Sequence, residues 1–428
     1  MSKRSLASRA AWGAFDQALS SFTNFILALL VARSAGVEQF GAFAVGFATY
    51  LVALSVSRGL ATEPLTIRYS AVPEAEWRRA TAAATGAAVA TGFVGSAVTV
   101  LAGLVLGGAM GTALLFVGLA MTPLLLQDAW RFAFFAARRG KAAFLNDLVW
   151  ALALVPGVLT IHLLGAISLE AWILVWALAG SAAAMFGIMQ SRVIPQPRRA
   201  LAWLREHREI APRLAIEGAL VSGTGHVTLL AVAGLAGLAT VGAVRAAQVL
   251  MNALHVASYG MLLFAVPEAV AIARRSRADV GRFCVLIGGG LVIVACLWGA
   301  VVLTIPDDWG TSILGAAWAD ARPVILPMAI VTAASGAQMG ALVGLRALAM
   351  AQKSLQARIA GSSLQLIGGV GGARLGGAIG TAWGLALGAV LGALLWWYQL
   401  VQATRQLGEM GTEGTEEVST AYSPVNRG

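Results

Sequence analysis

Two apolar runs joined by a short polar break stand near the start of the chain, in "TNFILALLVARSAGVEQFGAFAVG", residues 23–46. The break holds Arg33, Gly36, Glu38 and Gly41, and the apolar pattern resumes directly after it. An α-helix of about 20 apolar residues is long enough to cross the ~30 Å hydrocarbon core of a bilayer. The stretch therefore predicts a hairpin of two membrane-spanning helices.

The composition of the whole chain agrees with a membrane protein. Of its 428 residues, 58% are hydrophobic and 12% are charged, and the mean hydropathy is +0.78. Soluble domains are about 25% charged. The net charge of +10 lies mostly in short loops between apolar runs, so it indicates membrane topology rather than nucleic-acid binding. We expect no nucleic-acid partner.

The two cysteines, Cys284 and Cys296, fall within one expected helix. At the helical rise per residue they would lie about 18 Å apart, which is too far for a disulfide. We therefore expect no disulfide, no metal site and no cofactor.

Hydropathy predicts an all-α integral membrane protein with twelve transmembrane helices. The expected spans are 12–32, 41–58, 80–107, 112–133, 143–164, 170–190, 214–236, 240–265, 283–304, 323–345, 356–373 and 378–401.

The basic residues predict the orientation of these spans. With the N-terminus in the cytoplasm, 26 of the 30 basic residues fall in cytoplasmic segments. Because Lys and Arg are retained on the cytoplasmic side, this skew predicts that both termini are cytoplasmic. Most of the basic loops need no further role than this topology signal.

A polar stretch at 191–213 divides the chain into two halves of six spans each, and we expect a short surface helix in its middle. We predict an N-lobe at 1–190, a basic cytoplasmic linker at 191–213, a C-lobe at 214–402 and a disordered cytoplasmic tail at 403–428.

The two halves are similar in sequence. A passage like the opening one recurs at 227–248, "VTLLAVAGLAGLATVGAVRAAQ". At a shift of 201 residues, or of 211 for the last pair, the matches are Ala32 with Ala233, Gly36 with Gly237, Gly41 with Gly242, and Gln127 with Gln338. A duplication with an even number of spans per half implies a two-fold axis along the membrane normal, with a central cleft between the lobes.

Polar residues inside the expected spans mark candidate sites, because they are costly in hydrocarbon. In the eighth span, Arg245, Gln248, Asn252 and His255 fall within an arc of about 80° and form one polar stripe. Arg245 is the sharpest candidate, since a guanidinium can bind a phosphate or carboxylate through two hydrogen bonds. The alternative is that Arg245 extends to the outer surface or pairs with a structural carboxylate.

Other spans contribute further candidates. Asp16 and Asn24 share one face of the first span, and Asp128 and Arg131 lie close enough along the fourth span to pair. Acidic candidates for cation coupling, or alternatively for pairing with arginines, are Asp16, Glu63, Asp128 and Glu217. Candidates for the cleft, besides the stripe of the eighth span, are Asn24, Arg58 and Arg131.

The chain resembles polysaccharide (O-antigen-type) flippases of the multidrug/oligosaccharidyl-lipid/polysaccharide exporter superfamily. The likeness lies in the twelve spans, the duplicated lobes, the polar first and seventh helices, and an "ARxxGxxxFG" pattern that begins at Ala32-Arg33. It covers residues 1–402. The chain lacks the two additional helices of the related peptidoglycan-precursor flippases.

This resemblance implies a two-lobed fold like that of the drug exporters in the superfamily, and no enzymatic activity. It implies a multi-pass protein of the bacterial plasma membrane that flips polyprenyl-diphosphate-linked oligosaccharide from the inner to the outer leaflet. The diphosphate would contact Arg58 and Arg245, with Arg131 as a further candidate. Expected partners are the lipid-linked oligosaccharide, the bilayer, and a glycan polymerase or glycosyltransferases.

Two alternatives remain open from the sequence. One is a cation-coupled exporter of drugs or metabolites from the same superfamily, which would need an acidic cluster deep in the N-lobe. The other is a membrane-embedded glycan polymerase or ligase. Such an enzyme would need catalytic groups on an outer loop, and the largest such loop is 305–322.

Overall fold

A computed structural model describes residues 3–70, 72–273, 275 and 277–421 of the chain. The regular secondary structure of this part is all helical, and ten of its helices are long and apolar enough to cross a membrane. The principal helices are α1 (Lys3–Ser34), α2 (Val37–Ser57), α3 (Glu63–Arg68), α4 (Glu74–Leu106), α5 (Gly108–Ala136), α6 (Gly140–Leu163), α7 (Leu169–Ser191), α8 (Ala200–Glu206), α9 (Ala211–Ala273), α10 (Arg277–Leu303), α11 (Asp307–Leu314), α12 (Ala317–Ala321), α13 (Ile325–Ala347) and α14 (Ala351–Ala421).

Two of the long helices contain two spans each. Helix α9 is broken at Gly237, where φ is 81° and ψ is 171°, and α14 is broken at Gly376 and Gly377, where φ of Gly377 is 53°. Positive φ is readily adopted only by glycine, so these residues place the breaks. With both breaks counted, the described part holds the twelve expected spans, six in each half.

The second span ends in an unusual turn. Helix α2 continues into a π-helical turn, η1 (Arg58–Thr62), and then into α3. Such turns insert an extra residue into a helix and are frequent at functional sites. The turn begins at Arg58, one of the expected cleft residues.

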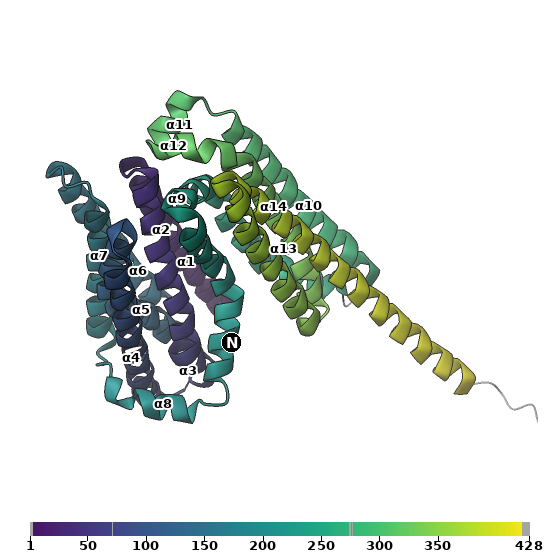
Figure 1. Cartoon of the computed structure of the whole chain (residues 1–428). Helices are drawn as coiled ribbons and strands as arrows, with labels where there is room; N and C mark the ends of the chain where they lie inside the picture. The colour runs from purple at the N-terminus through teal and green to yellow at the C-terminus, as the bar shows by residue number, and fades with distance from the viewer. Residues whose placement is uncertain (1–2, 71, 274, 276, 422–428) are drawn as a thin grey trace, which may run out of the picture.

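Figure 1 shows two bundles that lie side by side. One contains α2 and α4–α7, and the other contains α10, α13 and α14, with α8 beneath the first bundle. Helices α11 and α12 cap the opposite end of the molecule, in the expected outer loop 305–322. The all-α, two-lobed architecture with twelve spans is therefore confirmed.

The predicted linker contains the short helix expected in its middle, α8. Trp203 of α8 is buried, and its indole Nε1 donates to the carbonyl oxygen of Leu60 at 3.2 Å. The backbone of Gln196 donates to the carbonyl oxygen of Ala82 at 2.9 Å. These contacts hold the linker against the N-lobe.

The disordered cytoplasmic tail at 403–428 stays a prediction. Helix α14 runs on through Ala421, and residues 422–428 lie outside the described part.

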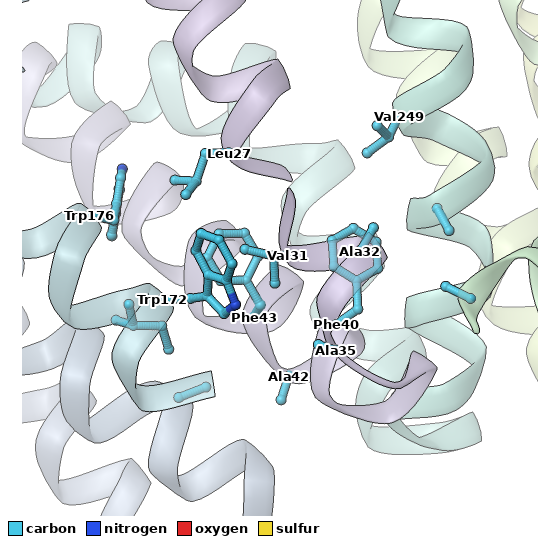
Figure 2. Packing of buried hydrophobic residues seen from close by; sticks show 14 of the residues in the cluster. Leu27, Val31, Ala32, Ala35, Phe40, Ala42, Phe43, Trp172, Trp176 and Val249 are labelled. Atoms are coloured by element: carbon cyan, nitrogen blue, oxygen red, sulfur yellow. The ribbon is translucent and has the colours of Figure 1, made fainter. Parts of the chain in front are cut away.

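An aromatic core joins α1, α2 and α7 within the N-lobe. Figure 2 shows Phe40 and Phe43 of α2, with Trp172 and Trp176 of α7, in this cluster. Val249 of α9 belongs to the same cluster, so the core continues across to the other half of the chain. Buried aromatic rings of this size give the N-lobe a rigid framework on which polar side chains can be held.

The two halves of α14 pack against each other through glycines. A methyl group on Gly372 would overlap the carbonyl oxygen of Gly380, and one on Gly384 would overlap that of Gly368. The paired residues are equally far from the break at Gly376, so the two halves run antiparallel. Small residues allow this close approach of helix backbones in a membrane.

We expect Gly372→Val to destabilise the protein by about 1–3 kcal/mol, since the added side chain must push the two helices apart. The matched control is Gly371→Val, because a Cβ atom at Gly371 would have no neighbouring atom within 4 Å. Thermal unfolding in detergent measures both. Equal losses in the two variants would mean that valine disturbs the helix itself and not its packing.

Candidate functional site

The two halves of the chain meet through a reciprocal glycine contact. A methyl group on Gly41 would overlap the carbonyl oxygen of Leu238, and a methyl group on Gly242 would overlap that of Val37. A shift of 201 residues relates Gly41 to Gly242 and Val37 to Leu238. A reciprocal contact of this kind is what a two-fold axis produces. The pseudo-two-fold axis expected from the sequence thus passes between α2 and α9.

The lobes also touch at two other places. Gly315, next to α11, lies against the carbonyl oxygen of Arg33 at the end of α1. At the opposite end of α2, Gly59 lies against the backbone of Ala215 in the first part of α9. Helix α2 therefore contacts α9 near both of its ends. The residues around the hairpin at 34–37 contribute to the contact between the lobes.

Five charged side chains form a network inside the N-lobe. Arg58 donates to both oxygens of Asp128, from Nε at 2.9 Å and from Nη2 at 2.6 Å. Arg131 donates from Nη2 to Asp16 Oδ2 at 2.6 Å. Its Nε lies 3.1 Å from Asp147 Oδ2, and its Nη1 lies 3.6 Å from Asp128 Oδ1. Four segments, α1, η1, α5 and α6, thus supply one network.

The network contains three aspartates and two arginines, so it carries one excess negative charge when all are ionised. It is deeply placed, since the side chain of Asp16 is 1% exposed and that of Arg131 is 12% exposed. Oδ1 of Asp16 has no hydrogen-bond partner among the described residues. Charges so far from water depend on each other and on nearby hydrogen-bond donors for their stability.

Two amides orient the third aspartate. Gln127 Nε2 donates to Asp147 Oδ1 at 2.8 Å and to Asn146 Oδ1 at 3.1 Å. Asn146 Nδ2 in turn donates to the carbonyl oxygen of Ala183 at 2.9 Å. The sequence analysis missed Asp147 and Asn146 as site residues. The sequence did contain a signal for them, because an adjacent Asn-Asp pair within an apolar span marks a candidate site.

Two of the residues expected to line the cleft are engaged in ion pairs instead. Arg58 and Arg131 were expected to contact a diphosphate, but both guanidinium groups are engaged by aspartates. Arg58 keeps a third of its side chain exposed and lies over the ring of Phe132, 5.1 Å from its centroid. The expected local pairing of Asp128 with Arg131 is present at 3.6 Å.

Three other candidates lie outside this network. Asn24 and Glu217 are exposed. Glu63 is half-buried and lies within electrostatic range of Arg58 and Glu217. Their candidacy for the cleft or for cation coupling rests only on their positions in the sequence.

The polar stripe of the eighth span lies on α9 just after the glycine contact. Arg245 is half-buried, and its Nη1 donates to Gln248 Oε1 at 3.2 Å. Asn252 is half-buried one turn further on, whereas the side chain of His255 lies outside the described residues. Within the described part of the chain, Arg245 makes no ion pair, and His226 is the charged or titratable side chain in electrostatic range. Arg245 thus differs from Arg58 and Arg131, which are neutralised.

Two six-span lobes related by a two-fold axis, with polar groups near the interface, define a multi-pass membrane protein of duplicated-lobe architecture. No protein-family model matches the sequence, and no curated protein matches it significantly. Solved structures do match along nearly the whole chain.

One such structure is "Inward-facing conformation of a multidrug resistance MATE family transporter of the MOP superfamily", with a TM-score of 0.71 and 12% identity over 93% of this chain and 99% of that one. Another is "Lipid II flippase MurJ, inward closed conformation", with a TM-score of 0.63 and 11% identity over 97% of this chain and 93% of that one. This chain therefore has the fold shared by these proteins.

The neighbours include transporters in more than one conformation. An outward-facing structure of a MATE family transporter gives a TM-score of 0.54, at 13% identity over 95% of this chain and 96% of that one. The inward-facing structure gives the higher score of 0.71. Both conformations of these transporters thus share the fold of this chain.

Proposed function

We propose that this protein is a transporter that moves polyprenyl-diphosphate-linked oligosaccharide from the inner to the outer leaflet of a bacterial plasma membrane by alternating access. The carrying observation is Arg245, a half-buried cation on α9 that makes no ion pair with the described residues. A cation held in a membrane without a carboxylate is costly unless a ligand with negative charge occupies the site during the working cycle. A diphosphate supplies that charge.

The arrangement of the lobes supports the same proposal. The glycine contact between α2 and α9 closes the end at the hairpins, which the basic residues place on the outer side. Closure at that end fits a protein that takes its substrate from the cytoplasm or the inner leaflet, and the contact of Gly59 with Ala215 at the opposite end would have to open for loading. Rocking about the pseudo-two-fold interface would then deliver it to the outer side.

A second candidate function is cation-coupled export of drugs or metabolites. The N-lobe network favours it, because one excess carboxylate in a buried cluster is a suitable place to bind a proton or another cation. Asp16, with one oxygen unbonded in the described part, is the candidate for that role. The same network also serves a flippase that is driven by a cation gradient, so it does not separate the two functions.

The enzyme alternative finds less support. In the outer loop, Asp307 Oδ1 accepts from Trp318 Nε1 at 2.8 Å and pairs with Arg322. These contacts hold α11 against α12, which is a structural use of the aspartate.

Depletion of the protein in its host tests the proposal. Polyprenyl-linked oligosaccharides are extracted, and their leaflet is assayed with a reagent that does not cross the membrane. We expect completed lipid-linked units to accumulate on the inner leaflet. Units that reach the outer leaflet but fail to polymerise would favour the enzyme. Unchanged lipid-linked sugars would contradict flipping and leave drug export as the leading candidate.

We expect Arg245→Ala to reduce flipping by roughly 10- to 100-fold, the effect of losing a charge-assisted hydrogen bond to the substrate. Stability should change little, because no ion pair is broken. The matched control is Arg282→Ala, whose side chain is 87% exposed on α10. Complementation of the depleted host measures flipping, and thermal unfolding measures stability. Flipping at the wild-type rate in Arg245→Ala would remove the residue from the substrate path.

A further inference from the structure

A polar pocket of about 300 Å³ lies inside the C-lobe, away from the N-lobe network and from Arg245. It is bounded by α13, by the first half of α14, by Leu254 of α9 and by Trp396 from the second half of α14. This volume is at the small end of the range for ligand sites, so it suits a headgroup rather than a whole lipid-linked sugar.

Two helical stripes face this pocket. On α14, Arg358, Ser362 and Gln365 line it at a spacing of four and then three residues, which is one face of a helix. On α13, the polar lining residues are Thr332, Ser335, Gln338 and Arg346. The lining therefore includes two arginines, two amides and three hydroxyl groups, and no carboxylate is among the described residues that line it.

The two arginines are placed to receive an anion. Arg358 lies over the ring of Trp396, with its guanidinium carbon 5.7 Å from the ring centroid. Gln338 Nε2 donates to the carbonyl oxygen of Ala389 at 3.0 Å, which fixes the amide beside the pocket. Arg346 and Arg358 stand on either side of the connection between α13 and α14, so the positive charge is concentrated toward that end of the lobe.

The N-lobe offers a direct comparison. Gln338 corresponds to Gln127 at the shift of 211 residues, and Gln127 belongs to the network of three aspartates and two arginines. At the corresponding place the C-lobe holds a pocket whose described lining has two arginines and no aspartate. The N-lobe network thus carries one excess negative charge, whereas the described lining of the C-lobe pocket carries positive charge. The duplicated positions have diverged to opposite electrostatic character.

We propose that the C-lobe pocket binds the phosphate groups of an anionic lipid headgroup through Arg346 and Arg358. The forked guanidinium group matches phosphate oxygens with two parallel hydrogen bonds. The connection between α13 and α14 lies on the side that the basic residues place in the cytoplasm, where such a headgroup would be loaded. This inference rests on the proposed function. It assigns the substrate a second binding site, separate from the polar stripe of Arg245, Gln248 and Asn252 on α9.

Binding of farnesyl diphosphate to the full chain in phosphatidylcholine nanodiscs tests the pocket. We expect the wild type to bind, and the double variant Arg346→Gln/Arg358→Gln to bind at least tenfold more weakly. Arg282→Gln is the control, because this exposed arginine lies in the same lobe and outside the pocket. Arg346→Lys/Arg358→Lys keeps both charges and should give an intermediate affinity, which separates lost binding from lost folding.

Inorganic pyrophosphate is the second probe, and it distinguishes a lipid from a free phosphate. Tighter binding of farnesyl diphosphate supports a lipid headgroup, whereas equal binding of the two probes overturns that assignment. Wild-type affinity in the glutamine double variant overturns the pocket itself, as does a wild type that binds neither probe. Neither failure would contradict the transport proposal, which is tested separately. That test measures in which leaflet lipid-linked oligosaccharide accumulates in depleted cells.

Discussion

Arg131→Ala is expected to abolish stable folding of the protein or to lower its stability by about 3–5 kcal/mol. The guanidinium lies 2.6 Å from Asp16, 3.1 Å from Asp147 and 3.6 Å from Asp128. Its removal leaves buried carboxylates without a cation, and breaking a buried ion pair in this way typically has that cost. Because whole domains are stable by about 5–15 kcal/mol, the loss is large. Thermal unfolding in detergent and the yield of monodisperse protein measure it.

Two further variants show whether unpaired charge is the cause. Arg139→Ala breaks a 2.6 Å pair with Glu74, but the arginine side chain is 47% exposed, so we expect a loss of at most about 1 kcal/mol. Arg131→Leu combined with Asp16→Asn and Asp147→Asn removes the cation together with two carboxylates that depend on it. This triple variant should recover much of the lost stability. If Arg131→Ala were as stable as Arg139→Ala, the network would not be a structural unit.

Gly41→Ala is expected to shift the protein away from the arrangement in which α2 and α9 meet at the hairpin end. The added methyl group overlaps the carbonyl oxygen of Leu238, so the lobes must separate at the hairpin end. An overpacked contact costs about 1–3 kcal/mol, which changes the ratio of two conformations by roughly 5- to 150-fold. Gly242→Ala should act in the same way, because the contact is reciprocal. Transport should fall in both variants, since alternating access needs both states.

Distances between spin labels measure this shift. Leu163 at the end of α6 and Trp309 in α11 are exposed positions on opposite lobes at the hairpin end, and the exposed Cys296 is replaced in the background. We expect a longer distance in Gly41→Ala than in the wild type. Gly36→Ala is the control, because a methyl group there meets open space and φ is −66°. Unchanged distances in Gly41→Ala would mean that the glycine contact does not hold the lobes.

Much of the fold could be predicted from the sequence because hydropathy and glycine act locally. The expected breaks near 237 and 375 coincide with Gly237 and with Gly376–Gly377. The helices are longer than predicted, as with α4, which begins at Glu74 rather than at residue 80. Acidic residues in its first turn favour the helix N-terminus and lie beyond the hydrocarbon.

The site could be predicted only in part. Periodicity placed Arg245 and Gln248 on one face, and the structure joins them by a hydrogen bond. Periodicity does not give the rotation of one helix against another, so the pairing of Arg131 with Asp16, 115 residues away, could not be foreseen. Topology accounted for Arg346 and Arg358 as cytoplasmic charges, and nothing in the sequence showed that they line one pocket.

Flipping by the purified protein tests the central claim most directly. Proteoliposomes are prepared with a fluorescently labelled polyprenyl diphosphate sugar in both leaflets, and a membrane-impermeant quencher is added outside, with and without a pH gradient. We predict that wild-type protein brings the inner pool of the lipid to the quencher, and that Arg245→Ala protein does so at least tenfold more slowly. An inner pool that stays as protected as in protein-free liposomes, under every gradient, would contradict the account.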